Sequence, residues 1–334
     1  MNLQMLSNKR TMLGLLISMV VGAVLLAPPA VAATYTVRYA MQKVPEDFVY
    51  RAKNWGAKFD VAVSETVSPS AVRSLEALLS GQADIADSGS GPVLSAMSRA
   101  PDKLIIIAAT HSGGQRHELM VRPDAPYKSV ADLRGKRIAV AVGSGAYIIF
   151  EKYIALKGWT NSDFQLVNMR PGDMGAALAS RQIDAALTWE PTPSILVMKK
   201  VVKVIQSFGE VSSDPALLVT TRAFAEAHPE ALTRVLASMI DMYKLILSDP
   251  KAAGELAAKA EEESGATVNS AVFTRAFQHM SFDMHVTPAA IDALQSVGEF
   301  MVKAHRISSV PDFNKLVDMR YLNDAFKLEG GVGK

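Results

Sequence analysis

The chain of 334 residues contains no cysteine. This absence excludes zinc sites built on cysteine ligands, iron–sulfur clusters, thiol catalysis and disulfide bonds. It also excludes a mature N-terminus that carries a lipid on cysteine. Every binding or reactive group must therefore be sought among the other side chains and the backbone.

The sequence has little excess of charge of either sign. Its formal net charge is +2, and two of the basic residues, Lys9 and Arg10, lie in an N-terminal segment of unusual composition. Without them, 33 basic residues stand against 33 acidic ones. A neutral chain provides no basic field for nucleic acid or anionic lipid, so neither is expected as a partner.

Motifs for nucleotide binding are also missing. The stretch 139–150, AVAVGSGAYIIF, has a strand, a glycine turn and a helix start. Its last fingerprint position is Ile148 instead of glycine, and Asp163 stands before the next expected strand instead of at its end. A phosphate-binding loop would need Gly-Lys-Ser/Thr, which is absent. The sequence therefore does not predict a nucleotide cofactor.

The same stretch does not predict a serine enzyme. Ser144 sits directly between two glycines, whereas a nucleophile elbow has the order Gly-x-Ser-x-Gly. The six histidines offer no spacing that pairs one of them with Ser144, and none forms a His-Glu-x-x-His metal motif. We interpret them as ordinary surface or half-buried residues, and we predict no catalysis, metal or cofactor.

The one long apolar run lies at the N-terminus. No charge occurs between Thr11 and Ala33, the basic pair precedes this run, and Pro-Pro followed by Ala-Val-Ala closes it. This order is typical of a secretory signal peptide over residues 1–32, cleaved near Ala32. The alternative is a retained membrane anchor, because the run approaches the ~20 residues that a span needs. An exported chain without a lipid anchor is most simply a free protein of the periplasm.

Strand and helix patterns alternate from residue 34 to residue 220. The almost wholly apolar stretch 104–110 is typical of a strand in a sheet covered on both faces. Beyond residue 221 nearly every segment has a helical pattern, and the last helix is expected over 312–326. The alternation predicts parallel α/β sheets.

A short internal sequence repeat divides the chain into two similar halves. ALLSGQADIA at 77–86 and ALASRQIDAA at 177–186 agree at six of ten positions, and in each a helix end and a turn precede a strand. We therefore expect two α/β lobes joined by two hinge crossings, near 121–124 and 217–221. The first lobe is expected to comprise residues 33–121 and 221–334, and the second residues 122–220. Open α/β sheets bind ligands beyond the carboxyl ends of their strands.

Two glycine-serine turns at such strand ends are candidates for holding an anion: 88–91 (SGSG) and 143–147 (GSGAY). Each precedes a helix, whose first N–H groups lack intrahelical partners and carry partial positive charge. The plainer alternative is that each is a turn with a serine N-cap. Trp189 and Glu190 end a further strand. Trp189 would wall off a ligand while Glu190 accepts from an ammonium or orients a neighbour, or they are a core tryptophan beside a solvated glutamate.

The chain resembles the periplasmic substrate-binding proteins of ABC transporters, in the group that binds sulfonates, taurine, nitrate and thiamine-pyrimidine precursors. The resemblance extends from about Tyr39 to Tyr321 and rests on LLSGQADIADSGSGP, LMVRPDAPYKSVADLRGKRIAVAVGSGAY, VNMRPGDMGAALASRQIDAALTWEP and TTRAFAEAHPEAL. It implies a type II periplasmic binding protein fold that closes on its ligand at the hinge. The family's ligand loops map onto Gln42, Ser88, Gly89, Ser90, His111, Ser112, Ser144, Gly145, Ala146, Tyr147, Trp189 and Glu190.

By this resemblance the protein is expected to be the solute-binding component of an ABC importer, a monomer that delivers its ligand to a permease of the inner membrane. A sulfonate or taurine-like anion is the first expected ligand, and a nitrate-like oxyanion the second. One alternative is a heteroaromatic, thiamine-precursor-like pyrimidine stacked on Trp189 and Tyr147. Others are a pyrimidine-synthesising enzyme relative and a ligand sensor.

Overall fold

The computed structural model describes residues 34–68 and 70–331. The expected signal peptide, residues 1–32, lies outside the described residues. Within the described part of the chain, no helix combines the length and the apolar character needed to cross a membrane.

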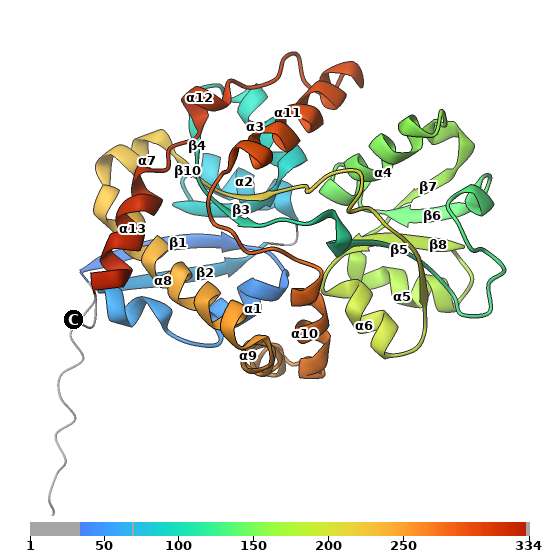
Figure 1. The fold of residues 1–334 in the computed structure, drawn as a ribbon, viewed down its shortest axis with the longest axis horizontal. Helices are drawn as coiled ribbons and strands as arrows, with labels where there is room; N and C mark the ends of the chain where they lie inside the picture. Colours follow the sequence, from blue (N-terminus) through green and yellow to red (C-terminus); the bar gives the residue numbers. More distant parts are fainter. Residues whose placement is uncertain (1–33, 69, 332–334) are drawn as a thin grey trace, which may run out of the picture. The chain divides into compact units, whose positions relative to one another are not determined.

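The first of two five-stranded sheets has the strand order β2-β1-β3-β10-β4 (Figure 1). Strands β1, β2 and β3 run parallel, whereas β10 is antiparallel to both of its neighbours. The strands are β1 (Tyr35–Met41), β2 (Val61–Val67), β3 (Ile85–Gly89), β4 (Leu104–His111) and β10 (Ala216–Thr221).

The second sheet has the order β7-β6-β8-β5-β9, and here β5 is the strand antiparallel to both neighbours. The two orders correspond position by position, with β5 in the place of β10. The predicted architecture of two α/β lobes joined by two crossings is therefore confirmed. The strands are β5 (His117–Val121), β6 (Arg137–Val140), β7 (Gln165–Asn168), β8 (Ala185–Trp189) and β9 (Lys203–Ser207).

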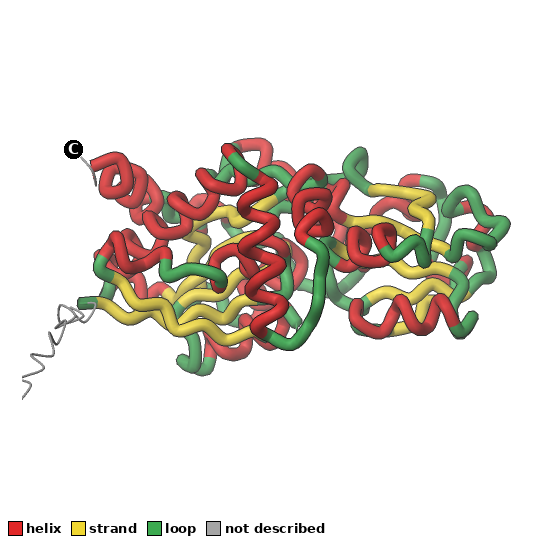
Figure 2. Tube along the Cα trace, turned by 90° about the horizontal axis from the view of Figure 1, so that it is seen from below, coloured by secondary structure: helices red, strands yellow, loops and turns green. Residues whose placement is uncertain are grey.

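Helices cover both faces of each sheet (Figure 2). In the first lobe, α1, α8, α9, α10 and α13 pack on one face and α2, α3, α11 and α12 on the other. In the second lobe, α4 covers one face, and α5 and α6 cover the other. Their bounds are α1 (Pro45–Arg51), α2 (Ala71–Leu79), α3 (Ser90–Arg99), α4 (Gly145–Leu156), α5 (Pro171–Ala179), α6 (Thr192–Met198), α7 (Arg222–Ala227), α8 (Pro229–Ser248), α9 (Pro250–Glu263), α10 (Ser270–Gln278), α11 (Pro288–Lys303), α12 (Phe313–Leu316) and α13 (Arg320–Gly331).

The helices on both faces of each sheet explain why the sequence of β4 is almost wholly apolar. In β4, Ile105 and Ile107 belong to one helix layer, Leu104 and Ile106 belong to the other, and all four are buried. Side chains of a strand alternate between its two faces, so a strand that is apolar at every position needs a cover on both. The prediction of a doubly covered strand at 104–110 is confirmed.

The crossings between the lobes lie earlier in the chain than predicted. β5 pairs in the second sheet, although residues 33–121 were expected in the first lobe. β10 pairs in the first sheet, although residues 122–220 were expected in the second lobe. The chain therefore changes lobes within 112–116 and again within 208–215. The prediction failed because the extended segments that were taken for crossings are strands of a sheet. β5 already pairs in the second sheet, and β10 already pairs in the first.

The prediction of one helix over 312–326 is wrong. The chain leaves the helical conformation after α12, where Val317 forms a bridge with Ile106 of β4. The Asp318 N–H then donates to the Ile106 carbonyl at 2.9 Å. Pairing with the sheet edge thus divides the segment into α12 and α13.

The internal sequence repeat corresponds to an ion pair that occurs once in each lobe. Arg38 in β1 donates through Nε to Asp84 at 3.0 Å, and Arg137 in β6 donates through Nε to Asp184 at 3.1 Å. In both copies the arginine N–H also donates to the carboxylate, and the aspartate N–H donates to the arginine carbonyl. Each aspartate thereby fastens the start of β3 or β8 to its parallel neighbour. The two sequence copies are structurally equivalent.

We expect Asp84→Asn to destabilise the protein by about 1–2 kcal/mol, because Asp84 is buried and accepts several charge-assisted hydrogen bonds from Arg38. The free energy of unfolding in urea measures this loss. The control is Asp124→Asn, since Asp124 pairs with Arg181 on the surface and such pairs contribute little. Equal effects of the two substitutions would contradict the structural role of Asp84.

Candidate functional site

A hollow of about 130 Å³ lies at the carboxyl ends of the parallel strands, beside both crossings. It is small beside the ~300–1,000 Å³ of ordinary ligand pockets, so it suits a compact ligand. We call it the inner hollow. Residues of both lobes line it: Gln42, Val44, Ser70, Ala71, Val72, Gly89, Pro92, His111, Arg116, His117, Ala141, Val142, Gly143, Ser144, Gly145, Arg170, Pro171, Trp189, Asp214 and Ala216. A wider hollow of about 630 Å³ adjoins it and shares five lining residues with it: Gln42, Ser70, Arg170, Pro171 and Trp189.

The predicted loops all approach this place, but only half of the predicted residues reach it. Those that line the inner hollow are Gln42, Gly89, His111, Ser144, Gly145 and Trp189. Those that do not are Ser88, Ser90, Ser112, Ala146, Tyr147 and Glu190. The contacts of the second group explain why each faces elsewhere.

The start of α4 contributes two residues to the inner hollow. Ser144 is the N-cap, and its hydroxyl accepts a hydrogen bond from the Tyr147 N–H at 3.2 Å, so the plainer interpretation as a serine cap also applies. Ala146 points into the core of the second lobe. The Tyr147 hydroxyl accepts from Asn161 at 3.2 Å, and the Arg306 guanidinium covers the ring at 4.7 Å. These contacts occupy Tyr147, which was expected to stack on a ligand.

The serine-rich turn before α3 serves contacts inside the protein. Ser88 is fully buried in β3, and Ser90 donates its hydroxyl to Asp214 Oδ1 at 2.5 Å. A Cβ on Gly91 would lie 2.0 Å from Ile148 Cδ1 of α4, so the start of α3 packs directly against the Ile148 side chain. The two predicted turns therefore face each other across the lobes.

Ser112 lies at the start of the first crossing and does not line the inner hollow. Its N–H donates to the Ser281 carbonyl at 2.8 Å, and the Ser281 N–H donates back at 2.9 Å. This backbone bridge to the segment after α10 holds the crossing in place.

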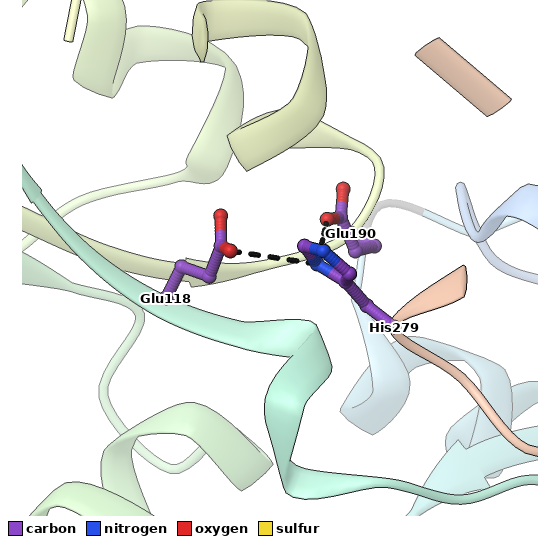
Figure 3. A group of neighbouring side chains, drawn as sticks. All are labelled: Glu118, Glu190 and His279. Carbon is purple, nitrogen blue, oxygen red and sulfur yellow. Dashed lines mark ion pairs between the residues drawn. The ribbon is translucent and has the colours of Figure 1, made fainter. Parts of the chain in front are cut away.

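Glu190 belongs to a buried ion cluster instead of the ligand wall (Figure 3). Its carboxylate accepts from the Ser194 N–H at 3.1 Å and from Arg275 Nη1 at 3.0 Å. Arg275 also donates to Glu118 at 3.0 Å, so α10 of the first lobe is fastened to β5 and to the start of α6. Glu190 is 1% exposed, so the expectation of a solvated carboxylate is wrong. Arg275 occupies the place that was expected for a ligand ammonium, and the contacts agree with the alternative that Glu190 orients a neighbour.

Glu118, Glu190 and His279 also have the spacing of a metal site, because one donor atom of each lies within 4.8 Å of the others (Figure 3). Arg275, however, already supplies positive charge to both carboxylates, and a cation would have to displace it. Burial, and then the charge of Glu190, raises the pKa of Glu118. We therefore interpret the group as an ion cluster between the lobes.

Replacing Arg275 with methionine should destabilise the protein, because two carboxylates would stay buried without their partner. Losing one member of a buried pair costs about 3–5 kcal/mol, and since the Arg275 side chain is 24% exposed we expect about 2–3 kcal/mol in urea unfolding. Adding Glu118→Gln and Glu190→Gln should restore much of the loss. A single variant as stable as the parent would contradict this role.

A buried ion pair at the inner hollow was not predicted. Arg116 is 5% exposed and Asp214 is 3% exposed. Arg116 Nη2 donates to Asp214 Oδ2 at 2.8 Å and to the Asp214 carbonyl at 2.7 Å. Although burial lowers the pKa of Arg116, a guanidinium remains charged in proteins. The wall of the inner hollow therefore carries a permanent positive charge with an internal partner.

Two histidines at the first crossing also line the inner hollow. His111 and His117 are 2% and 1% exposed, so the expectation of surface or half-buried histidines is wrong for both. Burial, and then the charge of Arg116, holds the pKa of His117 well below its ordinary value, so this ring is neutral. The available signal was the crowding of His111, Arg116 and His117 beside a glycine pair.

Three buried carboxyl groups, Glu46, Asp47 and Asp87, stand behind the first-lobe wall. Glu46 contacts His111 Nδ1, and Asp87 Oδ1 accepts from Gln42 Nε2 at 3.4 Å. Burial, and then the charge of Glu46, raises the pKa of Asp87 to about 8. Burial, and then the charge of Asp87, raises the pKa of Asp47 well above its ordinary value. The wall formed by Gln42 and His111 is therefore backed by two aspartates, Asp47 and Asp87, that resist ionisation.

We expect Asp87→Asn to remove part of the pH dependence of stability. The pKa of Asp87 is raised from 3.8 to about 8 in the folded protein. Its contribution to stability is therefore complete below about pH 4 and is lost as the pH rises toward about 8. The melting temperature of the variant minus that of the parent should therefore increase from pH 5 to pH 8. Exposed Asp292→Asn is the control, and a difference that stays constant over this range would contradict the expectation.

Comparisons with known proteins agree with this architecture. A family model described as NMT1/THI5 like matches residues 48–253, which is more than half of the chain. An Escherichia coli (strain K12) protein described as binding aliphatic sulfonates is 25% identical over 191 residues, which cover 57% of this chain and 60% of that protein's length. The taurine-binding periplasmic protein of the same strain is 27% identical over 228 residues, which cover 66% of this chain and 69% of that protein.

Solved structures share the fold at lower identity. The alkanesulfonate-binding protein SsuA from Xanthomonas axonopodis pv. citri, bound to MOPS, superposes with a TM-score of 0.74 at 22% identity, covering 87% of this chain and 99% of that one. The desulfurization enzyme DSZB gives 0.67 at 15% identity, covering 88% and 99%. The fold thus occurs in binding proteins and in an enzyme. The predicted periplasmic binding protein fold is confirmed, and this chain belongs to the NMT1/THI5-like family.

Proposed function

We propose that the protein is the solute-binding component of an ABC importer and captures a small organic anion between its lobes. The observation that carries this proposal is Arg116. Its guanidinium lies in the wall of the inner hollow, and its Nε has no hydrogen-bond partner among the described residues. A buried donor that bears charge and lacks a partner favours an acid group as its ligand.

The start of α4 supports the same location. Ser144 and Gly145 line the inner hollow, and α4 has 12 residues, so its first N–H groups carry the positive end of a helix dipole. A helix N-terminus of this kind stabilises sulfonate, phosphate or carboxylate oxygens. Arg116 and α4 would therefore share the head group of the ligand.

The ligand that we propose first is a sulfonate or a taurine-like aminosulfonate, and a nitrate-like oxyanion is second. Two relatives are described as binding aliphatic sulfonates and taurine, and the volume of about 130 Å³ suits a compact molecule. Apolar side chains such as Val44, Val72 and Ala216 line the rest of the inner hollow, as an alkyl chain would require.

We infer binding without catalysis. The Ser144 hydroxyl, which would be the nucleophile of a serine enzyme, accepts from the Tyr147 N–H as a helix cap. The relatives with the higher identities are described as binding proteins. Incubation with each bound candidate followed by mass spectrometry tests this inference, since turnover would overturn it.

The place of action that we propose is the periplasm, reached by export and cleavage near Ala32. A monomer would pass its ligand to a permease in the inner membrane. The periplasmic relative supports this location.

Ligand binding can be tested by thermal shift and calorimetry with ethanesulfonate, taurine, nitrate and a hydroxymethylpyrimidine. We expect a sulfonate to raise the melting temperature and Ser144→Ala to reduce that rise. The cap is lost as well, at about 1 kcal/mol, so the quantity to compare is the ligand-induced shift. Thr287→Ala removes a cap of α11 outside the inner hollow and should leave the shift intact. No response to any of the four compounds would contradict the proposal.

A pyrimidine is the alternative class of ligand, because Trp189 lines both hollows. An indole in a ligand wall favours a flat aromatic partner. Quenching of tryptophan fluorescence by the pyrimidine, without a response to taurine, would favour this ligand over a sulfonate.

A further inference from the structure

The carboxylate of Asp214 occupies the point where the anion-binding groups converge. Its Oδ2 lies 2.8 Å from Arg116 Nη2, and its Oδ1 accepts from the Ser90 hydroxyl at 2.5 Å. A Cβ on Gly145 would lie 2.8 Å from Oδ2, so this oxygen lies against the first residue of α4. Asp214 therefore meets the guanidinium and the beginnings of both facing helices, α3 and α4.

A second anion cannot share this point with Asp214. Like charges a few ångström apart repel strongly in a buried site. A buried Arg116 with no counter-ion would be equally unfavourable. Arg116 therefore pairs with a single anion, which is either the carboxylate of Asp214 or the acid group of a ligand.

Arg116 is not fully satisfied by its internal partner. Its Nε has no partner among the described residues, and the same holds for Nδ1 of the neighbouring His117. Both residues are at least nine-tenths buried and line the inner hollow. The described residues therefore leave part of the hydrogen-bonding capacity of Arg116 and His117 unused.

The backbone of Asp214 is strained. Its φ is +40°, in the left-handed region that side chains other than glycine rarely adopt. The residue lies on the second crossing, directly after exposed Ser213. The contacts of its carboxylate with Arg116 and Ser90 accompany this strained conformation.

We propose that Asp214 is a built-in substitute for the anionic head group of the ligand. It pairs with Arg116 while the site is empty, it gives way when the ligand's acid group binds, and it thereby sets the affinity. The ligand class in this assignment rests on the proposed function. Asp214 is thus a specificity-determining residue that competes with the ligand.

The decisive variant is Asp214→Asn, which keeps the shape of the side chain and removes its charge. By calorimetry, we expect the dissociation constant for ethanesulfonate to fall by about tenfold or more. We also expect sodium sulfate to raise the melting temperature of the variant by more than that of the parent, because sulfate excluded from the surface stabilises both proteins and only the variant would also bind it. Adding Arg116→Met should abolish both gains.

The matched control is Asp184→Asn, because Asp184 also pairs with an arginine, Arg137, but does not line the inner hollow. It should bind ethanesulfonate as the parent does. If Asp214→Asn does not fold, Ser90→Ala removes only the hydrogen bond to Oδ1 and should change the affinity in the same direction by less.

The outcomes separate this assignment from the proposed function. If the parent binds ethanesulfonate but Asp214→Asn binds it no more tightly, the assignment is overturned and the function stands. A gain that persists without Arg116 also overturns the assignment. If the variant gains sulfate binding through Arg116 while the parent binds no sulfonate, the assignment holds and the sulfonate function fails.

Discussion

The ion pair between Arg116 and Asp214 is the interaction around which the two lobes are arranged. Each residue lies on one of the two crossings, so the pair holds the crossings together at the base of the inner hollow. The beginnings of α3 and α4 meet the same carboxylate. Because an unpaired buried charge is costly, the crossings stay together unless another ion replaces one partner. Hinge geometry and ligand chemistry therefore depend on the same few atoms.

Further contacts connect the lobes on either side of this pair. The Arg275 cluster fastens α10 to β5 and α6. Elsewhere α4 meets the first lobe, where Arg306 donates to Glu151 at 2.7 Å and Ile148 packs against Gly91. These contacts use side chains that face away from the inner hollow. The site is consequently shaped by interactions that do not touch a ligand, which is why Glu190 and Tyr147 lie near it without lining it.

The fold was largely predictable because its signals are local. Three signals each depend on neighbouring residues: the alternation of strands and helices, the strands that are apolar on both faces, and the repeat at 77–86 and 177–186. The crossings were misplaced because an extended segment has the same local pattern inside a sheet and between two sheets. The loops of the site were found for the same reason as the fold. Arg116 and Asp214 were not found, because an isolated arginine and aspartate 98 positions apart gain meaning only when the fold pairs them.

The places of β5 and β10 in the two sheets have a consequence for the order of folding. All strands of the second sheet lie within 117–207, so that lobe can form as soon as this stretch has been made. In the first sheet, β3 and β4 do not pair with each other, because β10 lies between them. A chain made from its N-terminus must therefore keep two early strands apart, with open edges, until a strand more than 100 residues later fills the gap. Open edges of this kind invite wrong pairing, so protection of the unfinished first lobe is the main demand that this topology places on biosynthesis.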